Sequence, residues 1–176
     1  MSKYFDIKYD EKIIIKEMTE VVESLDFFKK NNIRIYFPFE DKNITEEVIV
    51  SQLEKDKIEN NPDQILKEVD DFLKINEDEI KSLLERYNDK FLINKQFKVF
   101  LNYYGCDGYY YFPDTIVVNL RHKAEYIAET IIHEMIHLLI EDLQKNSDYS
   151  KENEQEVDCI FVESGLKKIF KDYLVQ

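Results

Sequence analysis

One segment, from about Lys123 to Leu143, constrains the fold of this 176-residue chain more than any other. Its apolar residues recur at intervals of three and four, which is the period of a helix with one buried face. We expect that face to lie in the protein core, and it consists of Ile127, Ile131, Ile132, Met135 and Leu139. We also expect a sheet from roughly residues 96–120 to pack on this helix, with a last helix over 151–173 crossing beneath it.

The first half of the chain is predicted to be mainly helical. Apolar residues spaced three and four apart predict an amphipathic helix from about Glu11 to Lys30. The charged stretch 43–90 also predicts helices, with starts indicated by capping residues or by proline at three places: Asn43 with Glu46, Asn61 with Pro62, and Asn76 with Glu79. We interpret these helices as structural support.

Strands are predicted from alternation and from residue type. Residues 32–37 alternate in polarity, which predicts a short strand. β-Branched and aromatic residues dominate three later runs, at 97–104, 109–112 and 115–120. We expect these runs to form a small antiparallel or mixed sheet, most simply a meander of two or three antiparallel strands. The sequence therefore predicts an α+β fold in a single domain, 1–176, with a mainly helical part over 1–92 and a core over 93–176 that holds the sheet and the long helix.

Charge and composition narrow the classes of partner. The formal net charge is −13, and such an acidic surface repels phosphate backbones and anionic lipid headgroups. Neither nucleic acid nor membrane is therefore an expected partner. The first residues lack the cationic and apolar regions of a signal peptide, and the two cysteines, Cys106 and Cys159, suit a reducing compartment. We expect a cytoplasmic protein, and the sequence leaves its oligomeric state open.

Two histidines lie four residues apart in the long predicted helix. At about 100° per residue, His133 and His137 are separated by roughly 40° around the helix axis, so both imidazoles leave the same face. Two neutral imidazoles on one face supply half of a tetrahedral zinc site. Glu134, at the edge of that face, is placed to accept a proton from a metal-bound water. The alternative is a buried helix whose histidines are satisfied by neighbouring groups.

A third ligand is expected from the predicted last helix. Glu154 and Asp158 are four apart there and share one face. A carboxylate from a second helix would complete a set of two histidines and one glutamate, and Asp158 could then accept a hydrogen bond from the far nitrogen of a ligand histidine. Glu152 and Glu156 are alternative ligands. Read alone, this stretch is also typical of a solvated acidic helix start.

The pattern His-Glu-x-x-His followed by Glu-x-x-x-Asp on the next helix resembles the gluzincin zinc metallopeptidases, and over about residues 95–170 the layout looks most like their minimal members, the minigluzincins. The resemblance implies a zincin-like fold with zinc bound by His133, His137 and Glu154. It also implies Glu134 as general base and acid and Asp158 as the group that orients a ligand. An edge strand aligns the substrate in this family, and two segments could form it: Tyr109–Phe112 or Thr115–Leu120.

Other families that use two such histidines fit less well. The metzincin pattern requires Gly at 140 and His at 143, where this chain has Ile140 and Leu143. Peptide deformylases take a ligand from an upstream cysteine, and Cys106 is the candidate here, but the glycine-rich motif of that family is absent. The group that would stabilise an oxyanion is unassigned, with His122 and Tyr149 as candidates.

The function expected from these residues is zinc-dependent hydrolysis of peptide bonds in extended peptides or unfolded proteins, with Glu134 activating the zinc-bound water. A deformylase-like amide hydrolase is a weaker alternative. A non-enzymatic alternative is a zinc-binding scaffold that contacts a partner through acidic helices. The resemblance to the minigluzincins implies a third, a latent peptidase in which 165–176 folds back over the cleft.

Overall fold

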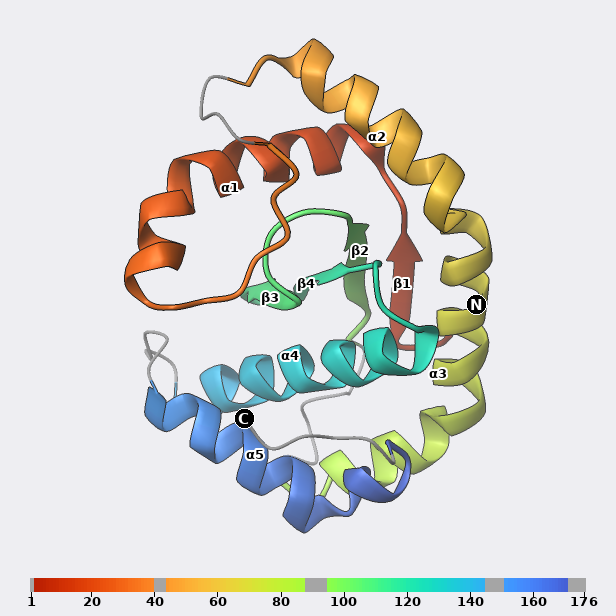
Figure 1. Ribbon diagram of the computed structural model, residues 1–176. Helices are drawn as coiled ribbons and strands as arrows, with labels where there is room; N and C mark the ends of the chain where they lie inside the picture. The colour runs from red at the N-terminus through yellow and green to blue at the C-terminus, as the bar shows by residue number, and fades with distance from the viewer. Residues whose placement is uncertain (1, 40–43, 88–94, 145–150, 171–176) are drawn as a thin grey trace.

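A computed structural model describes residues 2–39, 44–87, 95–144 and 151–170, without the side chains of 143, 144 and 151–153 (Figure 1). The fold is α+β. Along the chain the elements are β1 (Phe5–Lys8), α1 (Glu11–Lys30), α2 (Glu46–Asn60), α3 (Pro62–Leu84), β2 (Phe97–Asn102), β3 (Gly108–Tyr111), β4 (Thr115–Asn119), α4 (Ala124–Gln144), α5 (Lys151–Ser164) and a short 3-10 helix (Leu166–Lys168).

The sheet is mixed and has the strand order β1-β2-β4-β3. Strand β2 pairs in parallel with both β1 and β4, whereas β3 pairs antiparallel with β4. The predicted mixed sheet is confirmed, and β3 and β4 form one antiparallel pair of the expected meander. A meander of three antiparallel strands is wrong, because β4 lies between β3 and β2 and is parallel to β2. The physical reason is burial: Ile116, Val117 and Val118 of β4 are all buried, so this strand needs a neighbour on each side and a cover on each face. The half-exposed strand β3 takes the edge instead.

Two strands differ from the prediction. Strand β1 is absent from the prediction; its buried Phe5 and Ile7 alternate with Asp6 and Lys8, but a pattern of four residues is too short to indicate a strand. The strand predicted over 32–37 reduces to a single bridge between Tyr36 and Gly105.

Helices α1 and α4 lie on opposite faces of the sheet (Figure 1). The predicted core face of α4 is confirmed, since each of its five residues is at most 1% exposed: Ile127, Ile131, Ile132, Met135 and Leu139. Helix α4 in turn packs against α3 and α5. The metal-ligand pattern therefore lies on a helix that is covered by protein on several sides. Within the described residues, no helix is both long and apolar enough to cross a membrane.

Two of the three predicted helix starts lie within the described residues, and one of these two is wrong. Pro62 opens α3, and the Asn61 side chain accepts a hydrogen bond from the Gln64 backbone at 3.4 Å, as expected. Asn76 does not start a new helix, because α3 runs through it and its side chain donates to the Phe72 carbonyl at 2.8 Å. Helix α2 begins at Glu46, and Asn43 lies outside the described residues.

The last helix is shorter than predicted. Helix α5 ends at Ser164, where Gly165 takes a left-handed φ of +96° that favours glycine and stops the helix. Leu166 and Phe170 are then fully buried, and Phe170 packs against Phe72 and Phe161. The described part of the segment predicted to cover the cleft, 165–170, is therefore anchored on α3 and α5. Residues 171–176 lie outside the described part of the chain.

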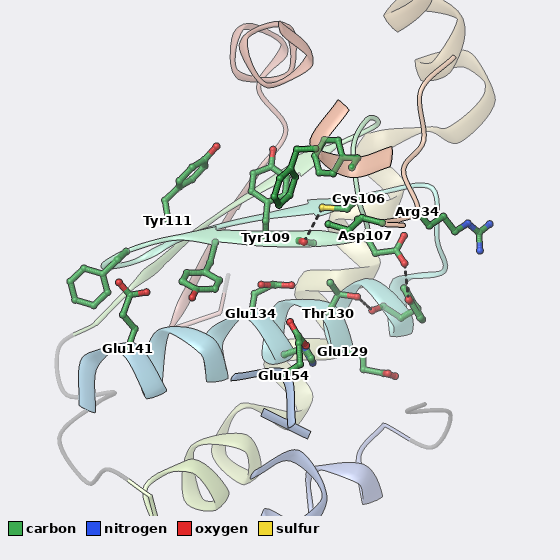
Figure 2. A pocket seen from close by; sticks show the side chains of 18 of the residues that line it. Arg34, Cys106, Asp107, Tyr109, Tyr111, Glu129, Thr130, Glu134, Glu141 and Glu154 are labelled. Atoms are coloured by element: carbon green, nitrogen blue, oxygen red, sulfur yellow. Dashed lines mark hydrogen bonds and ion pairs between the residues drawn. The ribbon is translucent and has the colours of Figure 1, made fainter. Parts of the chain in front are cut away.

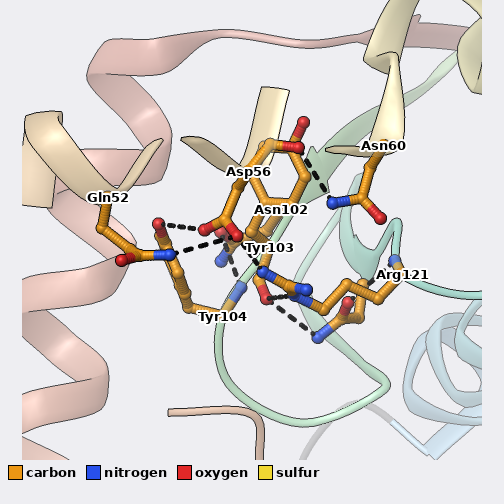
Figure 3. Close-up of polar contacts among 8 residues, drawn as sticks. Gln52, Asp56, Asn60, Asn102, Tyr103, Tyr104 and Arg121 are labelled. Carbon is orange, nitrogen blue, oxygen red and sulfur yellow. Dashed lines mark hydrogen bonds and ion pairs between the residues drawn. The ribbon is translucent and has the colours of Figure 1, made fainter. Parts of the chain in front are cut away.

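A buried carboxylate links α2 to the loops that flank the sheet (Figure 3). Asp56 is 1% exposed; it pairs with Arg121 and accepts hydrogen bonds from the Tyr104 hydroxyl at 2.8 Å and the Gln52 amide at 3.3 Å. Arg121 lies three residues before α4, and its guanidinium is 3.6 Å from the centre of the Tyr36 ring. This cluster therefore fixes the entry to α4 and the loop after α1 at the same point.

We predict that Asp56→Ala lowers the free energy of unfolding by about 3 kcal/mol, because the variant leaves the Arg121 guanidinium without its buried counter-ion. Urea denaturation monitored by circular dichroism measures the change. Asp71→Ala is the control, since Asp71 is exposed on α3 and should change stability little. Equal effects of the two substitutions would contradict a structural role for the cluster.

Candidate metal centre

His133 and His137 project from the same face of α4 into the protein interior. Their side chains are 12% and 3% exposed, and the two Nε2 atoms are 3.2 Å apart. The position of the histidines one helical turn apart accounts for this approach, and the apolar face of α4 on the other side holds the helix in place. The predicted convergence of the two imidazoles is therefore present in the structure.

Helix α5 brings a carboxylate to the same point. Glu154 Oε2 lies 3.3 Å from His133 Nε2, and Glu154 Oε1 lies 3.2 Å from His137 Nε2. Among the alternatives for this position, Glu156 is exposed, and the side chain of Glu152 lies outside the described part of the structure. Glu154 is thus the glutamate that the fold places against the histidines.

The spacing of these three groups fits a zinc ion. Ligand atoms about 2.0–2.1 Å from a tetrahedral zinc are separated from one another by roughly 3.3 Å. The two Nε2 atoms are 3.2 Å apart, and each lies 3.2–3.3 Å from a different oxygen of Glu154. With one ligand atom taken from each residue, all three lie within 4.8 Å of one another. Two imidazoles and one carboxylate are also the donor types of a catalytic zinc site with an open fourth position.

The charges of the site are balanced within this cluster. Burial alone would lower the pKa of His133, but hydrogen bonding to Glu154 and the nearby charges of Glu134, Glu154 and Asp158 raise it. Burial alone would raise the pKa of Glu154, but hydrogen bonds from the two imidazoles hold it well below its usual range. A carboxylate that stays ionised is suited to binding a cation.

Glu134 lies beside the three ligand atoms and faces β3. It is buried, and that burial raises the pKa of its carboxyl, although the two histidines act in the opposite direction. Gly108 of β3 makes the close approach of strand and helix feasible. A Cβ at that position would lie 2.9 Å from Glu134 Oε1 and 2.5 Å from Thr130 Cγ2. Glu134 is thus held as a buried, proton-accepting carboxyl next to the centre (Figure 2).

Asp158 lies one turn after Glu154 and is buried at 6% exposure. Its charge acts on His133 and raises the pKa of that imidazole, so the two side chains are close. This placement agrees with a group that orients the His133 ring.

An open cleft of about 970 Å³ adjoins the centre. One wall is β3, which is the edge strand; of the two predicted edge segments, Thr115–Leu120 is excluded because β4 lies inside the sheet. Tyr110 of β3 stacks on the His137 ring, with ring centres 5.3 Å apart and planes at 17°. Tyr109 and Tyr111 point to the opposite face, where their hydroxyls donate to Glu17 of α1. The strand that forms this wall of the cleft therefore contacts α4 on one face and α1 on the other.

Sequence reasoning missed the other wall of the cleft. It comes from the end of α1 and the residues after it: Phe27, Phe28, Asn32, Ile33 and Arg34. Phe27 is 55% exposed. A phenylalanine outside the apolar face of the predicted helix was the one signal in the sequence that could have indicated this wall. The first part of the chain thus contributes to the candidate site and is not only support.

Two other candidates within the described residues do not join the centre. Cys106 lines the cleft, but its thiol donates to the Gly108 carbonyl at 3.2 Å, and burial raises its pKa to about 12, which disfavours the thiolate that binds metals. His122 instead contacts Asp107, with His122 Nε2 2.9 Å from the carboxylate. Tyr149 lies outside the described residues. The oxyanion-stabilising group therefore stays unassigned.

Comparison of the chain with protein-family models, with curated proteins and with solved structures found no match. The function is therefore inferred from the geometry of the site.

We predict that the purified protein binds about one zinc ion per chain, measured by elemental mass spectrometry after dialysis. His133→Ala and Glu154→Ala each remove a ligand, so both should weaken zinc binding by more than the roughly 10- to 100-fold typical of losing an outer hydrogen-bond partner.

Glu156→Ala is the matched control, because Glu156 is an exposed glutamate on the same helix. It should retain zinc binding. Loss of zinc in Glu156→Ala but not in Glu154→Ala would contradict the assignment.

Proposed function

We propose that this protein is a zinc-dependent metallopeptidase of the gluzincin type, with a minimal zincin-like core, that hydrolyses peptide bonds of extended peptides or unfolded proteins. The observation that carries the proposal is the convergence of His133, His137 and Glu154, which bring two imidazole nitrogens and a carboxylate oxygen within 4.8 Å of one another. A zinc ion held there would polarise a peptide carbonyl and lower the pKa of water.

The general base in this proposal is Glu134. Its carboxyl is buried beside the centre, and a raised pKa strengthens it as a base toward water. Hydrolysis breaks the peptide C–N bond: the hydroxyl of water goes to the carbonyl carbon, and the proton passes through Glu134 to the departing amine. A scaffold that only binds zinc has no use for a buried carboxyl at this position, which favours the enzyme.

The substrate would lie along the outer edge of β3. An edge strand offers backbone N–H and C=O groups to an extended chain, and this pairing places a peptide over the cleft floor formed by α4. Gly108 and Tyr110 face that floor, at Glu134 and His137 respectively. The bond to be cleaved would therefore lie opposite residues 108–110. We propose peptides or unfolded chains as partners, because a folded surface does not present an isolated strand. We also propose that the protein acts in the cytoplasm.

Glu134→Gln is the direct test. The variant keeps the size of the side chain but cannot accept the proton, so hydrolysis of a denatured protein should fall by at least about 100-fold. Zinc content and melting temperature should change little, because Glu134 is not among the three ligands. Release of peptides by mass spectrometry measures the rate.

Glu125→Gln serves as control, since Glu125 is exposed on the first turn of α4. It should hydrolyse at the wild-type rate. If zinc-loaded wild type and Glu134→Gln are indistinguishable, the protein is a zinc-binding scaffold and the proposal fails.

A further inference from the structure

The edge of the chain is blocked just before the start of β3. Tyr36 forms an antiparallel bridge with Gly105, three residues before β3 begins, through two backbone hydrogen bonds of 2.8 and 3.0 Å. The stretch Asn32–Tyr36, hereafter the edge segment, thus occupies the line that a bound peptide would follow. Figure 1 shows this part of the chain passing beside β3 after the end of α1.

The edge segment is firmly held. The Arg121 guanidinium lies 3.6 Å from the centre of the Tyr36 ring, and the Tyr36 ring stacks on Tyr104 at 6.3 Å. At the other end of the segment, the Ile33 backbone N–H donates to the Phe28 carbonyl at 2.9 Å. Arg121 is itself paired with the buried Asp56. The segment is therefore a fixed wall and would have to break these contacts to let a peptide strand continue.

The distance from the metal centre to this wall is short. Arg34 precedes Tyr36 by two residues and Asp107 follows Gly105 by two, so the bridge brings Arg34 near Asp107, which immediately precedes Gly108. The charge of Arg34 acts on the Asp107 carboxyl, which supports this proximity, and both residues line the cleft (Figure 2). Since the centre lies beneath 108–110, about three residues of an extended peptide fit between it and the wall at roughly 3.4 Å per residue.

No strand among the described residues pairs with the outer edge at the opposite end of β3. Tyr111 is 43% exposed and Phe112 is 51% exposed, and both line the cleft. A peptide can extend past them without meeting the edge segment. The cleft is thus asymmetric, with a closed end at Asp107 and an open end at Phe112.

A positively charged side chain lies at the closed end. Arg34 is exposed, and it is the one lysine or arginine among the described residues that line the cleft. The neighbouring Asp107 carboxylate already accepts a hydrogen bond from Tyr126 at 3.1 Å and contacts His122 at 2.9 Å. The Arg34 guanidinium can therefore offer further donors to a second carboxylate.

We propose that the edge segment makes this protein a carboxypeptidase-type enzyme that removes one to about three residues from the C-terminal end of a peptide, with Arg34 binding the terminal carboxylate. This inference rests on the proposed peptidase function. Its polarity follows from antiparallel pairing, the more stable arrangement, which directs the C-terminus of a peptide bound to β3 toward Gly108 and the closed end.

Peptide binding tests the inference without turnover. The chain contains no tryptophan, so the fluorescence of a Trp-tagged peptide reports only the ligand. Zinc-loaded Glu134→Gln is titrated with a mixed-sequence pool of eight-residue peptides, acetylated and Trp-tagged at the N-terminus, as free acid or as C-terminal amide. We expect the free acid to bind about 10-fold more tightly, as for one charge-assisted hydrogen-bonded pair.

Arg34→Gln, added to the same protein, should abolish the preference for the free acid. Lys29→Gln is the matched control, because Lys29 is an exposed cation near the end of α1 that does not line the cleft. It should keep the preference. Equal binding of acid and amide, or a preference that survives Arg34→Gln, would overturn the inference.

Product analysis separates this inference from the function on which it rests. Wild-type protein should shorten an acetylated peptide from its C-terminus by one to about three residues, and the amide should be a poor substrate. Cleavage at internal bonds of long peptides overturns the C-terminal preference but leaves the peptidase standing. No zinc binding and no cleavage of any peptide overturn both.

Discussion

The approach of Glu154 to two imidazoles at the crossing of α4 and α5 is the contact on which the candidate site depends. Three polar groups that face one another in a largely buried position are costly unless a proton or a cation lies among them. In the protein without metal, hydrogen bonds between imidazole and carboxylate supply that compensation, and they account for the direction in which the pKa values of His133 and Glu154 move. In the proposed function, a divalent cation would satisfy the same three groups at once. The fold thus has to hold α5 firmly against α4, and Val157 and Phe161, both fully buried, do so on the turns that follow Glu154.

Around this centre, each part of the cleft is fixed by a separate long-range contact. Gly108 lets β3 approach Glu134, and the tyrosines of β3 tie the strand to Glu17 on α1. Asp56 and Arg121 fix the loop after α1 and the start of α4 together. The N-terminal part of the chain therefore shapes the cleft in two ways. Helix α1 contacts the edge strand β3, and the segment after α1 closes one end of the cleft. Residues of the first part of the chain thus form part of the cleft and hold its edge strand in place.

Local patterns in the sequence predicted much of this, and non-local contacts account for the rest. The period of apolar residues in α4 predicted which face is buried, and the spacing of His133 and His137 predicted that their side chains leave the same face. Both predictions depend only on helix geometry. The α+β class also followed from local patterns. The strand order did not: nothing local distinguishes a meander from a sheet in which β4 pairs in parallel with β2. Asn76 fits a capping pattern, yet the packing of α3 carries the helix through it. The cleft wall at Asn32–Arg34 was missed because it depends on the bridge between Tyr36 and Gly105, about 70 positions apart, which no periodicity encodes.

X-ray absorption at the zinc edge of the zinc-loaded protein tests the central claim most directly, because it reports which atoms surround the metal. The account predicts nitrogen and oxygen neighbours at about 2.0–2.1 Å, with the outer-shell pattern of two imidazoles. His133→Ala should remove one imidazole from that pattern. A sulfur neighbour at about 2.3 Å, from Cys106 or Cys159, or a spectrum without imidazole, would contradict a centre built from His133, His137 and Glu154.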